Sequence, residues 1–453
     1  MSTLALCGGT VVLGLEPVEL ASADVVIDGD RIAAVGPAPP GVPRRDCSGT
    51  LVMPGNVCAH THLYSALSRG MPYQLAPPGN FVQILQRIWW RLDRALDEPS
   101  IRMSALAGGL DALLAGTTTV FDHHASPNFI DGSLDVIASA LDELGLRSVL
   151  CYEVTDRDGK DRAVAGIAEN ARFLATGRPL ARGLMGAHAS FTMSDATLEA
   201  CAGAAAEAGA GVHIHVAEDA ADQRDALAGH GCSVVDRLAT AGVVTERALL
   251  AHCVHIDSRE RDILLASGAA IAHNARSNMN NGVGHSPVTG GGGERFGPAG
   301  AGWVALGTDG IGGDMITESQ AAFFRAREAS LAVAPSWPLD RLAASSRAAG
   351  RAFGEPLLGR IAAGAPADIT VLDYPAPTPV SAGNLAVHWI FGLSPRQVRD
   401  VLVAGELVIA DRRSTRVDTA RLAAEAAMQA SRLWTRLDDI PPHDFTPLGG
   451  EAG

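Results

Sequence analysis

Short apolar runs and longer amphipathic stretches alternate through the middle of this chain. Between about residues 56 and 355, eight apolar runs of strand length recur, most of them some 25 to 35 residues apart, and Ala- and Leu-rich stretches with a helical period separate them. These runs are Val57–His62, Thr117–His124, Arg147–Val154, Arg182–His188, Gly211–Glu218, Ala248–Ile256, Ala269–Arg276 and Trp303–Gly310. Eight strand–helix units predict an α/β fold of the (β/α)8 TIM-barrel type, whose active site lies at the carboxyl ends of the strands.

Both ends of the chain show a different pattern, in which short apolar runs are broken by turn residues. The dipeptide Asp28-Gly29 separates two such runs and is typical of a β-hairpin. A matching pattern returns at residues 367–373 and 398–406. We therefore predict a small composite β-sandwich built from both ends, with the alternative that each end pairs only with the central domain. The predicted units are residues 1–55 and 356–415 for the sandwich, 56–355 for the barrel and 416–453 for a C-terminal helix and tail.

Residues 81–96 follow the first run and have a helical period. Trp89 joins an apolar stripe that consists of Phe81, Leu85, Ile88, Leu92 and Leu96. Trp90 falls on the face of Arg87 and Asp93, and it is either a surface aromatic or a lid over the mouth of the barrel. Gln83 on the same helix is a weaker candidate to line the pocket.

Composition narrows the class of protein. Hydrophobic residues make up 47% and charged residues 19% of the chain, which is typical of a compact globular protein. A formal net charge of −14 argues against a nucleic-acid partner, and the sequence has no uncharged apolar run of membrane-spanning length. The seven cysteines form an odd set without a C-x-x-C pair, and no basic segment precedes an apolar stretch at the N-terminus. We therefore expect a cytoplasmic protein with reduced cysteines.

Histidines and acidic residues gather at the ends of the predicted strands. His60 and His62 close the first run, and because side chains of a strand alternate, both imidazoles point to the same face. This pair alone fits a metal site and a satisfied polar pair equally well. Later runs end in further residues of the same kinds, namely His123, His124, His188, His215, His252 and Asp309. The adjacent His123 and His124 point to opposite faces, so at most one of them faces the pocket.

The fifth run places an acid beside a histidine. His215 and Glu218 lie three residues apart across a strand end, so the imidazole can bind a metal ion while the carboxylate lies beside a bound water. His213 faces the same way but lies deeper, and we interpret it as a packed barrel residue. Three histidines with an aspartate suit a borderline cation such as zinc or ferrous iron, and an open position for water is the mark of a catalytic site. Such an ion lowers the pKa of its water to about 7.

These residues lie within motifs that resemble a known family. Nearly the whole chain is similar to the amidohydrolase superfamily, in its cytosine-deaminase-like and chlorohydrolase-like branch, and there to the SsnA group of aminohydrolases. The strand-one signature of the family lies at residues 54–62, Pro-Gly-Asn-Val-Cys-Ala-His-Thr-His. Stretches more specific to the group are residues 89–97, 122–127, 273–281 and 307–312.

The resemblance implies a role for each residue of the cluster. The metal ligands of the family correspond to His60, His62, His215 and Asp309. Glu218 corresponds to the proton shuttle and His252 to the group that orients the attacking hydroxide, while Asp309 also takes the proton of the water. His188 corresponds to a residue that contacts the substrate. The implied cofactor is one divalent metal ion, zinc in the first place, with iron and manganese as alternatives.

The scarcity of lysine bears on the number of ions. Members of the superfamily with two ions usually bridge them with a carboxylated lysine on a barrel strand. The only lysine here, Lys160, lies in a charged loop after the third run. The sequence therefore favours a single-metal site, which is the type associated with deaminases.

Arg276 departs from the family pattern, which often has proline and a small residue after the His-Asn of strand seven. Its planar guanidinium at the pocket mouth is able to bind a carboxylate or carbonyl oxygen of the substrate, and a structural ion pair with a loop acid is an equal alternative. Trp90, Glu153 and Gln83 are further substrate-binding candidates.

The predicted function is hydrolytic deamination, with release of ammonia, of a nitrogen heterocycle such as a purine, pyrimidine or triazine, or of a related guanidino or ureido compound. The runner-up is hydrolysis of a C–N amide bond or of a C–Cl bond at the same site. A third hypothesis is a catalytically silent accessory protein that binds a metabolite. We expect a small-molecule substrate, no nucleic-acid or membrane partner, and a homo-oligomer, most simply a dimer.

Overall fold

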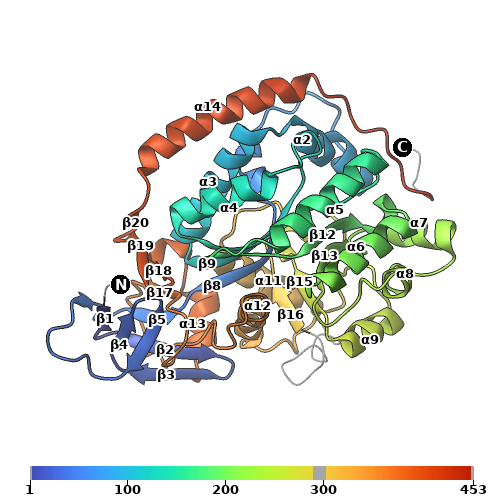
Figure 1. The fold of residues 1–453 in the computed structure, drawn as a ribbon. Helices are drawn as coiled ribbons and strands as arrows, with labels where there is room; N and C mark the ends of the chain where they lie inside the picture. Colours follow the sequence, from blue (N-terminus) through green and yellow to red (C-terminus); the bar gives the residue numbers. More distant parts are fainter. Residues whose placement is uncertain (1–2, 289–302, 450–453) are drawn as a thin grey trace.

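Parallel strands form the centre of the molecule in the computed structural model, which describes residues 3–288 and 303–449 (Figure 1). These strands are β8 (Asn56–Thr61), β9 (Thr117–His124), β10 (Arg147–Tyr152), β11 (Ala181–Gly183), β12 (Met185–Ala189), β13 (Val212–Val216), β14 (Leu249–His252), β15 (Ala270–His273) and β16 (Trp303–Leu306). One sheet has the order β11-β10-β9-β8 and the other the order β12-β13-β14-β15-β16. Most of these strands are buried along their whole length, which explains why the corresponding runs of sequence are apolar without alternation.

The two sheets meet at both of their edges. Thr61, at the end of β8, pairs in parallel with Asp309, which follows β16. Val154, which follows β10, pairs in parallel with Ala187 of β12, and the backbone N–H of His188 donates to Val154 O at 2.9 Å. The carboxyl ends of both sheets therefore face one shared region. The α/β class predicted from the sequence is confirmed.

Helices pack around these strands and against one another. They are α3 (Glu98–Leu114), α4 (Ser133–Leu144), α5 (Lys160–Leu174), α6 (Asp195–Glu207), α7 (Ala220–His230), α8 (Val234–Thr240), α9 (Ser258–Ser267), α10 (Ala275–Asn280), α11 (Met315–Ala329), α12 (Trp337–Phe353) and α13 (Leu385–Phe391). Many of them begin at a side chain that caps the first turn. In α9, for example, Asp257 and Glu260 form a capping box, and the helix ends at Gly268 in the left-handed region, with φ 75°.

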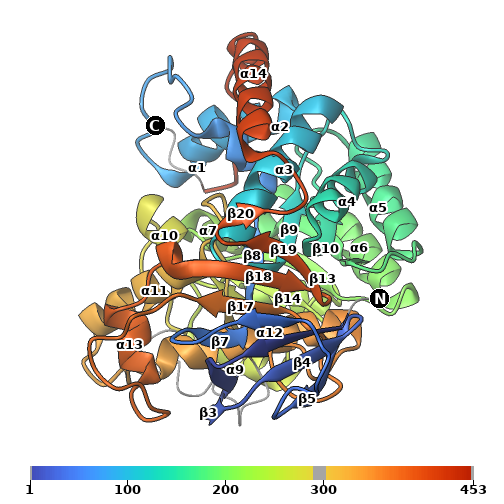
Figure 2. The same cartoon turned by 90° about the vertical axis from the view of Figure 1, so that its left-hand side faces the viewer.

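Strands from both ends of the chain share a separate β layer (Figure 2). The first part contributes β1 (Thr3–Cys7), β2 (Thr10–Leu15), β3 (Val18–Ser22), β4 (Val25–Asp28), β5 (Arg31–Val35), β6 (Arg44–Asp46) and β7 (Leu51–Pro54). The last part contributes β17 (Ile369–Leu372), β18 (Val398–Val403), β19 (Glu406–Ala410) and β20 (Arg413–Ser414). A seven-stranded sheet has the order β20-β19-β18-β17-β7-β2-β3, and a four-stranded sheet has the order β5-β4-β1-β6. The hairpin predicted at Asp28-Gly29 joins β4 to β5.

A buried ion pair ties this layer to the central strands. Arg147, at the start of β10, donates from Nε and Nη2 to the two carboxylate oxygens of Asp368, at 2.8 and 3.0 Å. Asp368 also accepts from the backbone N–H of Ala404 at 2.7 Å. Both charged side chains are almost fully buried, with 7% and 3% of their surfaces exposed. The pair is therefore a fixed joint between the two parts of the molecule.

The segment after β8 differs from its prediction. Residues 81–95 form α1 (Phe81–Ile84), a π-helical turn η2 (Leu85–Trp89) and α2 (Trp90–Ala95), where the sequence predicted one continuous α-helix. A π turn holds one more residue than an α turn, so it rotates the residues that follow it by about 100°. Trp90 thereby turns inward and is only 1% exposed. The surface-aromatic alternative is therefore wrong, and the lid over the mouth of the barrel stays a prediction.

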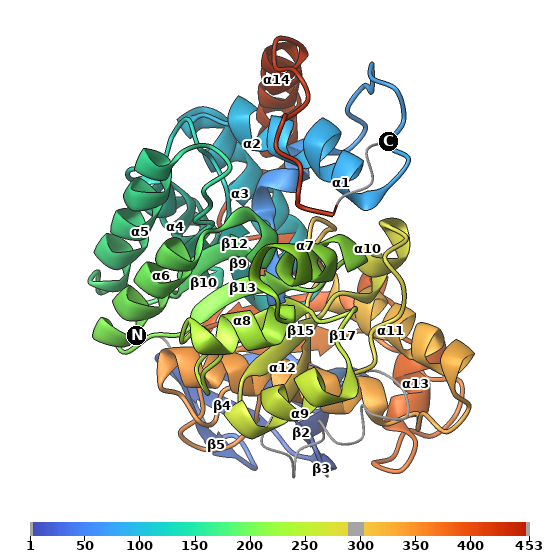
Figure 3. The same cartoon turned by 90° about the vertical axis from the view of Figure 1, so that its right-hand side faces the viewer.

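The last helix, α14 (Thr419–Asp438), buries Leu422, Ala430, Leu433 and Leu437. The chain then runs past α1 and α2 towards α7 (Figure 3). Gln86 Nε2 donates to Phe445 O at 2.8 Å, and Leu448 N–H donates to Asp225 Oδ1 at 2.6 Å. Nowhere in residues 3–288 and 303–449 does a helix have the length and apolar character that a membrane span requires.

Candidate metal centre and its pocket

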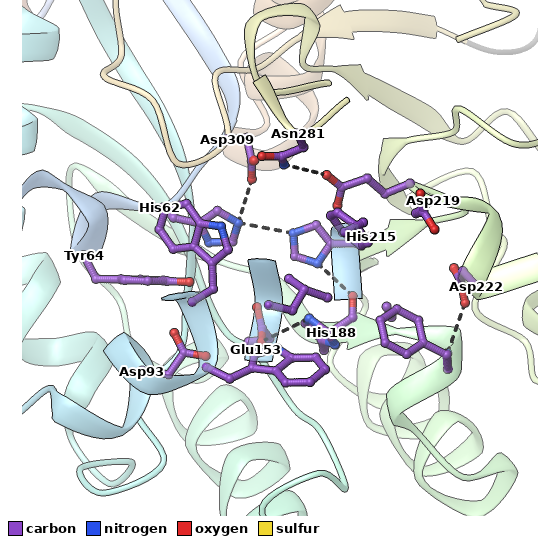
Figure 4. A pocket seen from close by; sticks show the side chains of 17 residues that line it. His62, Tyr64, Asp93, Glu153, His188, His215, Asp219, Asp222, Asn281 and Asp309 are labelled. Atoms are coloured by element: carbon purple, nitrogen blue, oxygen red, sulfur yellow. Dashed lines mark hydrogen bonds and ion pairs between the residues drawn. The ribbon is translucent and has the colours of Figure 1, made fainter. Parts of the chain in front are cut away.

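Four side chains from three strand ends converge at the shared edge of the two sheets. They are His60 and His62 at β8, His215 on β13 and Asp309 after β16, and all four are buried. Figure 4 shows three of them, His62, His215 and Asp309. One ligand atom from each lies within 4.8 Å of the others. His62 Nε2 lies 3.2 Å from His215 Nε2 and 3.0 Å from Asp309 Oδ1, and His60 Nε2 lies 3.3 Å from the same oxygen.

These separations fit one small cation. Ligand atoms at about 2.0–2.1 Å from a tetrahedral zinc ion lie about 3.3 Å from one another. Donors of neutral imidazole and carboxylate type are those that zinc and similar divalent metals accept. The four residues therefore fit the ligand set that the sequence predicts.

Backbone and side-chain partners hold the three imidazoles in place. His62 Nδ1–H donates to His123 O at 2.5 Å, and His215 Nδ1–H donates to His188 O at 2.9 Å, which leaves both Nε2 atoms free to bind an ion. A 2.8 Å hydrogen bond joins His60 Nδ1 to His213 Nε2. His213 is thus the packed residue that its depth on the strand predicted.

The electrostatics of the cluster favour a positive charge among these groups. Burial lowers the pKa of His60 to about 3 and that of His215 well below its ordinary value, so both imidazoles are neutral. Burial acts to raise the pKa of Asp309, but hydrogen bonds from His60 and His62 hold it well below the usual range. The same carboxylate raises the pKa of His62 to about 9 against the effect of burial. A carboxylate beside the neutral imidazoles of His60 and His215 is a favourable environment for a cation, and the raised pKa of His62 reflects the same attraction for positive charge.

Backbone strain gathers at this edge as well. Ala217, His252, Cys253 and Asp309 have φ values of 45°, 73°, 49° and 54°, in the left-handed region that side chains other than glycine rarely adopt. Each of them follows or ends a parallel strand. Strain of this kind persists where the surrounding structure fixes it, and it is found most often at functional sites.

A carboxylate outside the ligand set lies next to the centre. Glu218 Oε2 is 3.5 Å from His252 Nε2, and Glu218, His252 and Asp309 form a second cluster with ligand atoms within 4.8 Å of one another. Burial raises the pKa of Glu218 to about 7. A carboxyl group whose pKa is near neutrality is suited to accept and donate protons.

The centre lies at one end of a pocket with aromatic walls (Figure 4). Its apolar lining consists of Tyr64, Phe81, Leu85, Trp89, Trp90, Ala189 and Phe191. Its polar lining consists of His62, Asp93, Glu153, His188, His215, Glu218, Asp219, Asp222, Asn281 and Asp309. Such a pocket suits a planar, partly apolar molecule with a few polar groups.

A buried ionic network forms one side of the pocket. Arg157 donates to Glu153 Oε1 at 2.9 Å and to Asp93 Oδ2 at 2.8 Å, and His123 Nδ1–H donates to Glu153 Oε2 at 3.2 Å. Burial raises the pKa of Asp93 to about 8. Sequence patterns did not identify Asp93 as a pocket residue or Arg157 as its partner, because the two lie 64 residues apart in the chain.

Three of the five predicted substrate-binding residues line the pocket, namely His188, Glu153 and Trp90. Gln83 does not belong to the lining, and its Oε1 accepts from the backbone N–H of Gly79 at 2.9 Å. Neither His123 nor His124 belongs to the lining.

Arg276 also lies outside the lining. Its Nε donates to Glu318 Oε2 at 2.5 Å and its Nη2 to Gly312 O at 3.0 Å. The reason is that α10 begins at Ala275, so the strand pattern that pointed this side chain at the pocket mouth no longer applies. The geometry corresponds to the structural ion pair that was the alternative interpretation.

Comparison with known proteins identifies the family. The model of the amidohydrolase family matches residues 51–408, and the chain therefore belongs to this family. It is 31% identical to a 5-methylthioadenosine/S-adenosylhomocysteine deaminase of Halobacterium salinarum, over 96% of this chain and 99% of that one. It is 28% identical to a 5'-deoxyadenosine deaminase of Methanopyrus kandleri, over 84% of this chain and 86% of that one.

Solved structures agree with this placement. A zinc-bound adenosine deaminase from Xanthomonas campestris has a TM-score of 0.82 and 25% identity, with 96% of this chain and 99% of that chain covered. A zinc complex of an atrazine chlorohydrolase from Arthrobacter aurescens has a TM-score of 0.79 and 23% identity, with 94% and 100% covered, and shows the same fold. The chain is a metal-dependent hydrolase of the aminohydrolase class in the deaminase and chlorohydrolase branch, as its sequence predicted.

Proposed function

We propose that this enzyme removes an amino group by hydrolysis from the base of an adenosine-type nucleoside, in particular one modified at the 5' position. The observation that carries the proposal is the position of Glu218, a buried acid beside the metal cluster but outside its ligand set. The names of the relatives, which are deaminases of 5-methylthioadenosine, S-adenosylhomocysteine and 5'-deoxyadenosine, support this substrate class.

The proposed cofactor is one zinc ion, held by the residues His60, His62, His215 and Asp309. When bound, such an ion acidifies a water molecule and supplies a nucleophile at neutral pH. Lys160, the only lysine of the chain, is exposed at the start of α5. It is exposed, whereas the four residues of the cluster are buried, and this supports a single ion.

The residues around the ion divide the acid–base work in this proposal. Asp309 and His252 orient the attacking water, and Asp309 accepts its proton. Glu218 delivers a proton to the ring nitrogen next to the reacting carbon. The water oxygen first forms a bond to the reacting carbon, which gives a tetrahedral intermediate that still carries the amino group. The proton held by Asp309 then passes to the amino nitrogen, the C–N bond breaks as the C=O bond forms, ammonia leaves, and the remaining hydroxyl proton returns to Glu218. Positioned acid–base groups of this type contribute about 10²–10⁴-fold in rate.

The residues that line the pocket bind the substrate in this proposal. Trp90, Phe191 and Tyr64 present aromatic faces and edges to a planar base. Asp93 and Glu153, the two members of the ionic network that line the pocket, provide hydrogen-bonding groups for the polar part of the substrate.

Finer features of the architecture belong to the same proposal. The hydrogen-bonded edges of the two parallel sheets support a single (β/α)8 barrel, and the sheet shared by β7 and β17 supports a composite sandwich of residues 1–55 and 356–415. A C-terminal unit of residues 416–453, a homodimer and a cytoplasmic location remain predictions.

The test is ammonia release by purified protein of known metal content. The panel includes 5'-methylthioadenosine, S-adenosylhomocysteine, 5'-deoxyadenosine, adenosine, cytosine and an aminated triazine, with mass spectrometry of each product. We expect conversion of the adenosine derivatives to their hypoxanthine counterparts, one zinc ion per chain, and loss of activity after chelation that zinc restores. Failure of fully metallated protein to release ammonia from any of them contradicts the proposal, and chloride release from a chlorinated triazine instead supports the runner-up.

A further inference from the structure

We propose that the short helix α10 and the residue after it set the positions of all three acid–base groups of this enzyme. Ser277, Asn278 and Asn281 are positioning residues in this proposal, which rests on the proposed function for the roles of the groups they hold. These residues lie in the stretch 273–281 that the sequence singled out, but neither the ligand set nor the proposed reaction assigns them a part.

Each of the three side chains holds a different group. Ser277 Oγ–H donates to Asp309 Oδ2. Asn278 Oδ1 accepts from His252 Nδ1–H at 2.8 Å. Asn281 Nδ2–H donates to Glu218 Oε1 at 3.2 Å (Figure 4). It also donates to Ser277 Oγ at 3.3 Å.

The two carboxylate oxygens of Asp309 have different partners. Oδ1 lies beside His60 and His62, where it faces the metal cluster. Oδ2 receives the hydroxyl of Ser277, which is 3% exposed. The hydroxyl therefore prevents the carboxylate from turning about its bond to the chain.

The contact with His252 fixes the ring and its proton. Because Asn278 Oδ1 is an acceptor, the hydrogen of the imidazole lies on Nδ1. Asn274 Nδ2–H donates to the other ring nitrogen, Nε2, at 3.3 Å, and this nitrogen faces Glu218 Oε2 at 3.5 Å. The imidazole thus presents an unprotonated nitrogen to the reacting groups.

The position of α10 allows it to hold all three acid–base side chains at once. Glu218, His252 and Asp309 follow or end three different strands, β13, β14 and β16. Ser277 and Asn281 are four residues apart and share one face of a helical turn, and Asn281 N–H donates to Ser277 O at 2.8 Å. One helical turn therefore forms hydrogen bonds to three side chains that come from the ends of three different strands.

Arg276 anchors this turn from the other side. Its backbone N–H and its Nε both donate to Glu318, a fully buried residue of α11, at 3.2 and 2.5 Å. The arginine that departs from the family pattern thus fastens the positioning helix and does not contact the pocket. Its side chain and those of Ser277 and Asn278 all leave the same short helix in different directions.

The experiment compares three disruptive variants with three conservative ones. Ser277→Ala, Asn278→Leu and Asn281→Leu remove the hydrogen bonds to Asp309, His252 and Glu218, respectively. Ser277→Thr, Asn278→Asp and Asn281→Gln keep the hydroxyl, the acceptor and the amide. Met279→Ala is the matched control, because Met279 lies on the same helix and is 43% exposed. The readouts are kcat, KM, zinc content, Tm and a crystal structure of each zinc-loaded variant.

We expect kcat to fall roughly ten- to hundredfold in the disruptive variants, which is the loss that a hydrogen bond to a charged or reacting group brings. KM should change less than about threefold, zinc content should stay full, and the conservative variants should recover most of the rate. Met279→Ala should match the wild type. Crystal structures should show the released carboxylate or imidazole in a new rotamer.

Two results overturn the proposal. One is a disruptive variant with full zinc, unchanged side-chain positions and wild-type kcat. The other is a loss of kcat that follows loss of zinc or of Tm, which marks Ser277, Asn278 and Asn281 as merely structural. If wild-type protein deaminates nothing in the substrate panel, the proposed function fails, but the side-chain positions in the crystal structures still decide whether the helix holds these groups.

Discussion

Glu218→Gln is the variant that most directly tests the chemistry. Glutamine has the shape of glutamate, and its amide oxygen is able to keep the hydrogen bond from Asn281 Nδ2 that Glu218 Oε1 accepts at 3.2 Å. The amide nitrogen then faces His252 Nε2, which is 3.5 Å from Glu218 Oε2 and able to accept from it. Because Glu218 does not belong to the four-residue metal cluster, zinc binding and folding should be unaffected.

The amide cannot transfer the proton, and this sets the magnitude of the effect. Loss of a positioned acid–base group lowers kcat by about 10²–10⁴-fold, which is about 2.7–5.4 kcal/mol of transition-state stabilisation at 1.36 kcal/mol for each factor of ten. Since substrate contacts are kept, KM should change little, so the loss should lie in kcat.

The assay measures ammonia release from 5'-methylthioadenosine at saturating substrate, with zinc content determined on the same preparation. Asp219→Asn serves as control: Asp219 lines the same pocket, and its side chain caps α7 by accepting from Ala221 N–H, a bond that asparagine keeps. Fully metallated Glu218→Gln with near wild-type kcat would refute the reasoning. A parallel loss of zinc and rate would instead assign Glu218 to the metal site.

Three further predictions concern stability. Arg276→Ala leaves the carboxylate of Glu318 buried without its guanidinium, so it should lower the free energy of unfolding by about 3–5 kcal/mol in urea titrations and leave KM near the wild-type value; an unchanged midpoint would count against the ion pair. Arg147→Ala should lower the free energy of unfolding by a similar amount, because it leaves the carboxylate of Asp368 buried between the two parts of the molecule without its guanidinium partner. A decrease of less than about 1 kcal/mol would contradict this. Burial raises the pKa of Asp340 from 3.8 to about 6, so the folded state binds this proton more tightly than the unfolded state and loses stability as pH rises from about 4 to about 6. Asp340→Asn should therefore be stabilising at pH 8, by at most about 3 kcal/mol, and nearly neutral at pH 4, and equal gains at both pH values would disprove the assignment.

The positions of the central strands were predictable because the pattern that marks a buried strand lies within a short stretch of sequence. A strand with both faces buried is apolar over most of its length, and the eight predicted runs overlap β8 to β16. The convergence of His60, His62, His215 and Asp309 followed in turn, since the carboxyl ends of parallel strands lie at one edge.

The wrong predictions concern positions where the repeat of the backbone changes, from an α-helical to a π-helical turn or from a strand to a helix. The π turn at residues 85–89 rotates Trp90 into the pocket wall, and no α-helical stripe is able to reveal such an extra residue. Arg276 was assigned to the pocket on the assumption that the seventh strand continues past His273, whereas α10 starts at Ala275.

Other site residues depend on contacts across the whole fold. Asp93 and Arg157 meet over 64 residues of sequence, and Asn281 reaches Glu218 across 63. Sequence patterns give the orientation of a side chain relative to its own helix or strand, but not the partner that a distant loop brings to it. The motif at residues 273–281 was the one available signal, and it marked the stretch without indicating what it holds.

The shared β sheet has a consequence for how the chain is made. Strand β7 ends at Pro54 and is flanked by β2 on one side, but its other neighbour, β17, begins at Ile369, more than 300 residues later. At 5–20 residues per second, a ribosome needs roughly 15–60 s to reach that point. During this interval the open edge of β7, whose residues are all buried in the final fold, is exposed to other nascent chains. Protection of that edge by a chaperone during synthesis should therefore raise the yield of folded protein.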